Sequence, residues 1–359
     1  SDGCSSGLHG SMLLYSLLYL TGYDLSLEEL KIFRRWGSRT PGHPEYGVTP
    51  GVEITTGPLG QGLATAVGMA MAEAHLAAVY NRPGHEIINH YTYVLASDGD
   101  LMEGVTSEAC SLAGHLRLGK LIVFYDDNRI TIDGATDISF TEDRAKRYKA
   151  YHWQVLHVQD GNNVEELNAA IEAAKADLRP SIILCRTHIG YGYPSWQDNS
   201  AAHSGIPSKE ELEGAKKNLG YPTEPLFYVS EEVLAHYREA VPAGEKLEAD
   251  WNAKFAAYEQ AFPELAAELK RILAGELPPG WEDKLPVFKP DTKGTPTRSA
   301  SNKVINALSG VIPEMMGGSA DLTTSNSTLI ENTKGFQADQ YDGRYIYFGV
   351  RAHAMGPIM

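Results

Sequence analysis

The chain has 359 residues, which is enough for two domains with sizeable cores. Hydrophobic residues make up 43% of the sequence and charged residues 21%, as in ordinary globular proteins. The net charge of −15 argues against a nucleic-acid partner, so a phosphorylated ligand would depend on a few local basic groups. We expect no apolar run long enough to span a membrane and no signal peptide at residues 1–6, and hence no membrane partner. The three scattered cysteines favour a reducing compartment, so a cytoplasmic location is expected.

The first predicted elements are an apolar helix that begins near Gly10 and a loop at residues 37–45 that is rich in proline and glycine. A glycine-rich turn at residues 57–62 then opens a helix that runs to about residue 80. On residue type alone, His9 is more often a cap or surface residue than a ligand, and the loop that contains His43 could be simply a rigid turn. A glycine-rich turn before a helix is likewise weak support for a binding site.

A strand–helix–strand unit follows. Residues 91–96 and 121–125 are short β-branched and aromatic runs that predict buried strands, and a helix from about 105 to 116 fits between them. An acidic turn follows each strand. In open parallel sheets ligands bind at this edge, so we expect a site there.

The side chains at these two strand ends suit a metal ion. Asp98 supplies a carboxylate and Asn128 an amide oxygen, and a backbone carbonyl from the loop after Asn128 could join them. Hard oxygen ligands of this kind favour Mg²⁺ or Ca²⁺ over Zn²⁺. Gly99 allows the backbone to approach a phosphate closely. The alternative is an ordinary acidic loop, but two complementary strand ends favour a metal–diphosphate site.

The rest of the chain continues the α/β pattern and then changes. Residues 142–189 predict helix, strand, helix and strand, with the strands at 153–158 and 182–185. Residues 207–275 predict charged helices that form a packing arm. Residues 277–296 contain five prolines and predict a linker. We therefore expect domains at 1–276 and 297–359, with the linker between them.

The sequence resembles the transketolase family over nearly its whole length. Asp98-Gly99, 28 further residues and then Asn128 is similar to the thiamine diphosphate fingerprint, with Ser97 in place of its first glycine. The resemblance implies an α/β fold: a doubly wound parallel-sheet domain that binds the cofactor diphosphate, followed by the start of a second α/β domain that binds its pyrimidine. The family uses thiamine diphosphate with Mg²⁺ or Ca²⁺.

The resemblance also implies roles for individual residues. His43 and His203 would be catalytic, and Glu103 and Glu108 would lie at the interface of a homodimer with shared active sites. The metal would be held by Asp98, Asn128 and the carbonyl of Ile130. The substrate phosphate would be bound by Arg298 and Ser325, with His203 nearby. The cofactor would contact His9, Gly57, Pro58, Leu59, Gly99, Asn128, His203 and Asp321.

The activity implied is reversible transfer of a two-carbon ketol unit from a ketose phosphate to an aldose phosphate. One departure is chemically important: Ala352 stands where the family has the glutamate that holds the cofactor pyrimidine. An inactive fragment or relic that still binds thiamine diphosphate and Mg²⁺ is therefore an alternative. A fragment of an ordinary transketolase with altered ends explains the same facts, and a dihydroxyacetone synthase-like enzyme shares much of the pattern.

Overall fold

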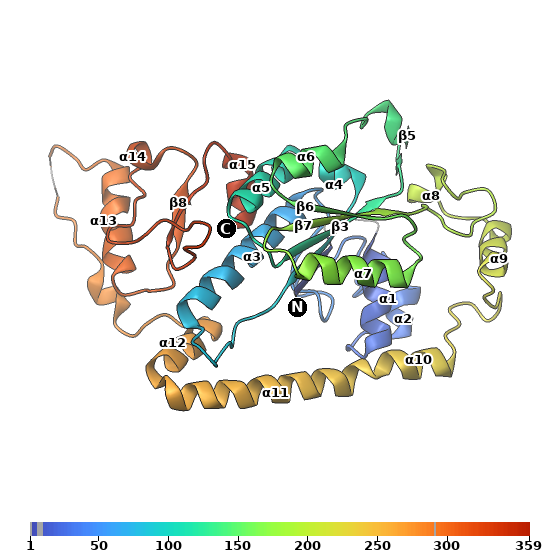
Figure 1. The fold of residues 1–359 in the computed structure, drawn as a ribbon, viewed down its shortest axis with the longest axis horizontal. Coiled ribbons are helices and arrows are strands. Elements are labelled where there is room, and N and C mark those ends of the chain that lie inside the picture. The colour runs from blue at the N-terminus through green and yellow to red at the C-terminus, as the bar shows by residue number, and fades with distance from the viewer. Residues whose placement is uncertain (1, 6–9, 291) are drawn as a thin grey trace. The chain divides into compact units, whose positions relative to one another are not determined.

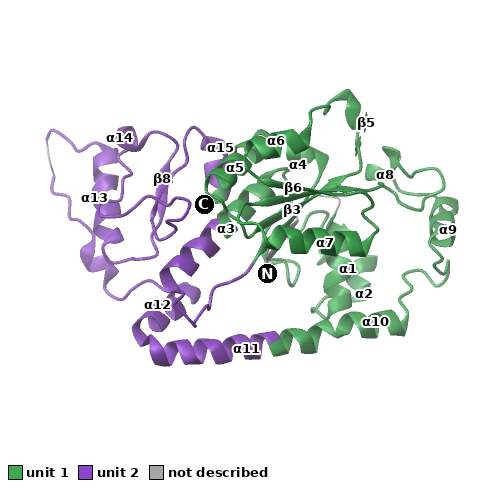
Figure 2. Cartoon of the chain, viewed as in Figure 1, with its two compact units in different colours: residues 1–70, 91–246, 358 green, residues 71–90, 247–357, 359 purple. Residues whose placement is uncertain are grey.

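The computed structural model describes the backbone of residues 2–5 and, with side chains, residues 10–290 and 292–359. The chain forms two compact units (Figure 2). Unit 1 comprises residues 1–70, 91–246 and 358, and unit 2 comprises residues 71–90, 247–357 and 359. The division falls inside two helices rather than at 277–296, so the predicted domain limits stay a prediction.

A five-stranded parallel sheet forms the centre of unit 1 (Figure 1). Each neighbouring pair is parallel, and Ala96 lies opposite Tyr125 in the register. This confirms the predicted doubly wound α/β fold, although the first strand was not predicted. The strand order is β1 (Asp2–Ser5), β2 (Thr92–Ala96), β3 (Leu121–Asp127), β7 (Ser181–Arg186) and β6 (Gln154–Val158).

Helices cover both faces of this sheet because alternate strand residues point to opposite sides. Ile122 and Ile183 pack with Ala170 and Ala174 of α7 (Val164–Lys175) on one face. On the other face lie α5 (Gly104–His115) and α6 (Arg144–Ala150) (Figure 1). Trp153 joins these two helices: its indole N–H donates to Cys110 O at 2.8 Å, and its ring packs edge-on against Tyr148.

The N-terminal part of unit 1 contains α1 (Ser11–Thr21), α2 (Leu27–Lys31) and the start of α3 (Gln61–Tyr80). By length and composition α3 could cross a membrane, so the expectation that no run is long enough is wrong on those criteria. Half of its most apolar stretch is buried inside the protein, and Leu63, Ala64 and Val67 are completely buried. The core of a globular protein produces the same pattern, so this helix is weak support for a membrane span.

Short elements complete unit 1. After α7 and the sheet come the short helix α8 (Ala201–Ser204) and the charged helices α9 (Lys209–Asn218) and α10 (Glu231–Arg238). The loops at the strand ends contain α4 (Asp98–Met102), the hairpin of β4 (Ile130–Thr131) and β5 (Gly134–Ala135), and the 3₁₀ turn η2 (Thr136–Ile138).

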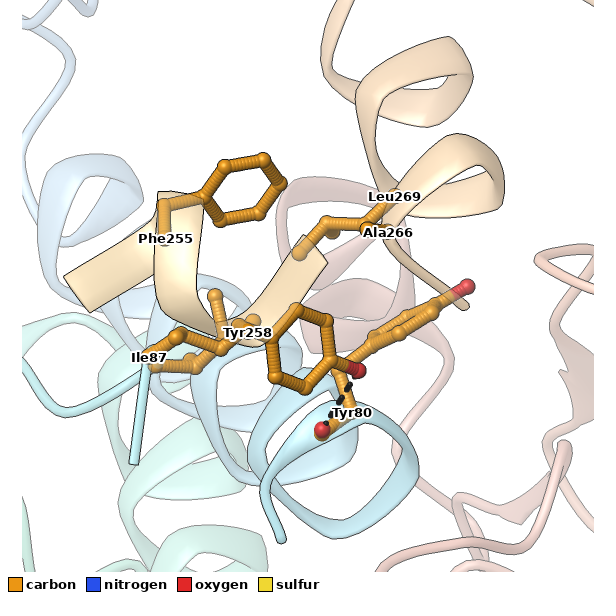
Figure 3. Packing of buried hydrophobic residues seen from close by; sticks show 7 residues of the cluster. Tyr80, Ile87, Phe255, Tyr258, Ala266 and Leu269 are labelled. Atoms are coloured by element: carbon orange, nitrogen blue, oxygen red, sulfur yellow. Dashed lines mark hydrogen bonds between the residues drawn. The ribbon is translucent and has the colours of Figure 1, made fainter. Parts of the chain in front are cut away.

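Unit 2 has its own aromatic core (Figure 3). Tyr80 and Ile87 pack with Phe255 and Tyr258 of α11 (Ala240–Ala261) and Leu269 of α12 (Pro263–Leu273). The hydroxyl of Tyr258 donates to the carbonyl of Tyr80 at 2.8 Å. The predicted charged arm therefore has one apolar stripe, which is buried against the end of α3.

The remainder of unit 2 begins with the 3₁₀ turn η3 (Trp281–Lys284) inside the predicted linker. It continues with α13 (Thr297–Ser309), β8 (Gly317–Ser319), α14 (Thr323–Asn326), β9 (Tyr345–Tyr347) and α15 (Ala352–Ile358), and β8 pairs in parallel with β9. β9 is short, and Gly349 just beyond it has a φ of +65°, outside the extended range.

Candidate active site

The loop after β2 is fixed by Asp100. Ser97 caps α4, and the carboxylate of Asp100 accepts from the backbone N–H and the hydroxyl of Ser97, each at 2.8 Å. Its other oxygen accepts from Gly60 N at 2.9 Å, and the residue is completely buried. Asp100 therefore joins the glycine-rich turn to the strand end. α4 was not predicted, although Ser97 followed three residues later by an acidic residue is a capping-box pattern.

Asp98, the first residue of α4, has two oxygens in different surroundings. It is 3% exposed, and Oδ1 accepts a hydrogen bond from the hydroxyl of Tyr125. Among the described residues, buried Oδ2 has no hydrogen-bond partner. Burial raises the pKa of Asp98 to about 6, against the opposing effect of the Tyr125 hydrogen bond. A buried carboxylate oxygen without a donor fits a cation ligand.

The second strand end presents Asn128 and Ile130. Oδ1 of Asn128 accepts from Ile130 N at 2.9 Å, and Nδ2 donates to Asp126 at 3.3 Å. β2 and β3 are parallel neighbours in register, so the loops that carry Asp98 and Asn128 leave the same edge of the sheet. No group of three His, Cys, Asp or Glu side chains suited to a metal occurs in residues 10–290 or 292–359. A cation at these strand ends would meet carboxylate, amide and carbonyl oxygens, which are ligand types that suit Mg²⁺ or Ca²⁺.

The glycine-rich turn lies beside these loops and beside His43. Gly57 has a φ of +137°, and a Cβ atom there would be 2.6 Å from Cδ2 of His43. A Cβ atom on Gly99 would be 2.9 Å from Cδ1 of Leu59. The structure therefore brings His43 to the turn and Leu59 to the strand end. Pro58, between Gly57 and Leu59, is exposed.

Basic residues surround the end of β3. Asp127 forms an ion pair with Arg144 at 3.4 Å, and its backbone carbonyl accepts from Arg186 at 2.9 Å. The Arg144 guanidinium lies 5.8 Å from the centre of the Tyr125 ring. An open cavity of about 300 Å³ lies at this edge. It is lined by Asp127, Arg129, Glu142, Asp143, Arg144, Ala145, His157, Val158, Gln159, Leu184 and Arg186.

Three other predicted site residues of unit 1, His203, Glu103 and Glu108, lie in or at the start of helices. His203 lies in α8, half-buried, after a loop in which His188 pairs with Asp198 at 2.9 Å. Glu103 is the exposed N-cap of α5, and Glu108 lies within that helix, half-buried. Their roles stay predictions. His9 lies outside the described residues.

The candidates of unit 2 lie near α13 and α14. Arg298, in the first turn of α13, donates to the carbonyl of Ser325 at 3.3 Å, so the structure brings this predicted pair together. The contact uses the backbone of Ser325 rather than its hydroxyl. Asp321 is exposed with a φ of +64°, and Ala352 is the exposed first residue of α15.

Together, the open parallel sheet, the polar side chains at adjacent strand ends and the glycine turn define an α/β domain with a candidate ligand site at the carboxyl ends of its strands. The matching family model, described as "Transketolase, thiamine diphosphate binding domain", covers residues 4–278. The chain belongs to the transketolase family, which consists of transferases, and residues 4–278 form its thiamine diphosphate-binding domain.

Relatives support this assignment at high identity. The chain is 58% identical over 350 residues to the transketolase of Geobacillus stearothermophilus, covering 97% of this chain and 52% of that protein. It is 52% identical to chloroplastic transketolase-1 of Arabidopsis thaliana, and the match covers 98% of this chain and 48% of that protein. A crystal structure of a Pichia stipitis transketolase complex with sedoheptulose-7-phosphate has a TM-score of 0.97 at 47% identity, covering 100% and 54%. The chain thus spans about half the length of the relatives it matches.

Proposed function

We propose that this chain supports reversible transfer of a two-carbon ketol unit between sugar phosphates, with thiamine diphosphate and a divalent cation bound at the β2–β3 strand ends. The observation that carries the proposal is the Asp98 carboxylate, whose buried Oδ2 lacks a partner among the described residues. Burying a neutral polar group without a hydrogen bond costs on the order of 2–7 kcal/mol, and burying an unpaired charge costs more. A cation at Oδ2 would offset that cost.

In this proposal Asp98, Asn128 and the carbonyl of Ile130 hold the cation, which neutralises the diphosphate. Gly99 and Gly57 carry no side chain and would let the backbone approach the cofactor closely. When bound, thiamine diphosphate supplies a carbanion centre and an electron sink for breaking the bond beside a carbonyl. The protein supplies orientation, exclusion of water and proton transfer. Pro58, Leu59 and Asp321 would complete the cofactor contacts, with His9.

The remaining roles follow the same scheme. His43, which lies against Gly57, would hydrogen-bond a sugar hydroxyl. His203 would contact the cofactor and stabilise negative charge during the reaction. Arg298 and Ser325, already in contact, would bind the substrate phosphate. Glu103 and Glu108 would lie at the interface of a homodimer. The scattered cysteines favour a cytoplasmic setting.

A second candidate function is binding of the cofactor without turnover. Ala352 favours it, because a methyl group cannot hold a pyrimidine nitrogen as a glutamate does. The two candidates are separated by a ketol-transfer assay with Mg²⁺, thiamine diphosphate, a ketose phosphate and an aldose phosphate. Product formation that requires the cofactor supports turnover. Cofactor binding without product supports the second candidate, and absence of both contradicts the proposal.

A further inference from the structure

Tyr125 makes the two oxygens of Asp98 unequal. The tyrosine is completely buried in β3, and its hydroxyl donates to Oδ1 of Asp98. Oδ2 of the same carboxylate is buried and has no hydrogen-bond partner among the described residues. A cation that approaches Asp98 therefore meets one oxygen already in use and one oxygen available.

A second carboxylate, that of Asp127, also lies close to the phenol oxygen. The phenol oxygen lies 3.3 Å from Oδ1 of Asp127, which is two residues further along β3 and on the same face. Asp127 is held by Arg144 at 3.4 Å and, through its carbonyl, by Arg186 at 2.9 Å. The Arg144 guanidinium also lies over the Tyr125 ring, and both members of the Asp127–Arg144 pair are largely buried. The phenol has a single proton, so Asp127 is a more distant, competing acceptor; its ion pair with Arg144 weakens that competition and leaves Asp98 as the main acceptor.

The number of available carboxylate oxygens affects which cation binds. Ca²⁺ takes six to eight oxygens at ~2.3–2.6 Å and often uses both oxygens of a carboxylate, whereas Mg²⁺ prefers octahedral geometry at ~2.0–2.1 Å with one oxygen from each ligand. Restricting Asp98 to one oxygen removes one ligand that Ca²⁺ could use and none that Mg²⁺ needs.

We propose that Tyr125 is a positioning residue that sets the metal preference of this site: by occupying Oδ1 it confines Asp98 to single-oxygen coordination and shifts selectivity from Ca²⁺ toward Mg²⁺. The inference rests on the proposed function, since it assumes that a cation binds at Asp98. Tyr125 acts through the carboxylate and does not touch the metal.

The test is calorimetric titration of the full chain with MgCl₂ and with CaCl₂, comparing wild type with Tyr125→Phe. Loss of the hydroxyl frees Oδ1, and the ratio of Ca²⁺ to Mg²⁺ affinity rises roughly tenfold, at the lower end of the usual effect of such supporting residues. The control is Tyr15→Phe, another completely buried tyrosine, whose hydroxyl donates to Pro41 O at 2.8 Å. It leaves the ratio unchanged.

An unchanged ratio of Ca²⁺ to Mg²⁺ affinity in Tyr125→Phe overturns the proposal. This includes an equal loss of affinity for both cations, which is the result expected if the substitution only loosens the fold. If wild type binds neither cation, the proposed function fails together with this inference, and that result is distinct from an unchanged ratio. Infrared difference spectra of wild type with ¹³C-labelled aspartate provide a measurement that needs no variant. Wide splitting of the carboxylate stretches with both cations supports single-oxygen coordination, and a narrow splitting with Ca²⁺ overturns it.

Discussion

The imidazole of His43 lies against the α-carbon of Gly57, so closely that a Cβ atom at position 57 would be 2.6 Å from Cδ2 of the ring. The φ of +137° at Gly57 is also one that residues with a side chain rarely adopt. The loop that carries His43 can therefore pack against the turn beside the strand ends only because residue 57 is a glycine.

Replacing Gly57 with alanine is expected to displace His43 and lower thiamine diphosphate affinity at least about tenfold, because a misplacement of ~1 Å can cost about 100-fold in an active site. Isothermal titration with the cofactor and Mg²⁺ checks this. The matched control is Gly47→Ala, since Gly47 has a φ of +79° and no atom within 4 Å of the added Cβ. Equal affinities in the two variants would show that the contact with His43 is unimportant.

Substitutions of Asp98 and Asp100 are expected to affect different properties of the protein, cation binding for Asp98 and stability for Asp100. Asp100→Ala leaves the N–H groups of Ser97 and Gly60 without their acceptor and should lower the free energy of unfolding by about 3 kcal/mol, as for several hydrogen bonds to a charged group. Asp98→Asn should leave the metal-free protein about as stable as wild type but abolish cation binding. Urea denaturation and metal titration of both variants check this. Similar effects of the two substitutions on both measurements would contradict the assignment.

The Arg271–Glu314 ion pair gives unit 2 a pH-dependent contribution. Both oxygens of Glu314 accept from Arg271, at 2.7 and 2.9 Å, and this contact lowers the pKa of Glu314. The stabilisation is therefore present above the ordinary glutamate pKa of roughly 4.3 and is lost as the pH falls through the lower value of the folded state. Glu314→Gln should cost about 1–2 kcal/mol at pH 7 and much less at pH 3, measured by urea denaturation.

The control is Glu259→Gln, which removes the carboxylate from the Lys270–Glu259 ion pair. That pair is more exposed than the Arg271–Glu314 pair, so its loss should cost only ~0.5 kcal/mol. A difference between wild type and Glu314→Gln that is the same at pH 7 and pH 3 would count against a charged Glu314 as the source of the stabilisation.

Ala352→Glu tests whether this position limits turnover. The substitution supplies a carboxyl group at the start of α15, where the resemblance to the family implies a glutamate that holds the pyrimidine. We expect ketol transfer to rise about 10²–10⁴-fold, the usual range for a general acid–base group. Initial rates with saturating Mg²⁺ and thiamine diphosphate check this. Equal rates for wild type and the Ala352→Glu variant would show that the alanine is not a defect.

Local patterns predicted much of the sheet and the place of the site. The apolar runs that became β2 and β3 were predicted as strands, and their polar termini placed Asp98 and Asn128 at one edge; β3 is largely buried, whereas Leu95 of β2 is exposed. Other features depend on contacts distant in sequence. Asp98 and Asp100 are both aspartates and lie two residues apart, so the sequence does not distinguish their roles. The roles are distinguished by their hydrogen-bond partners, which are Tyr125, 27 residues from Asp98, and Gly60, 40 residues from Asp100. Tyr125 was predicted only as a buried strand residue.

The most direct test of the central claim is titration of the full chain with thiamine diphosphate, in Mg²⁺ and in a chelator, for wild type and Asp98→Asn. If Asp98 and Asn128 anchor a metal–diphosphate site, wild type binds the cofactor only with Mg²⁺, and Asp98→Asn weakens that binding at least about tenfold. Equal binding in the chelator, or an Asp98→Asn protein that binds as wild type does, would contradict the account.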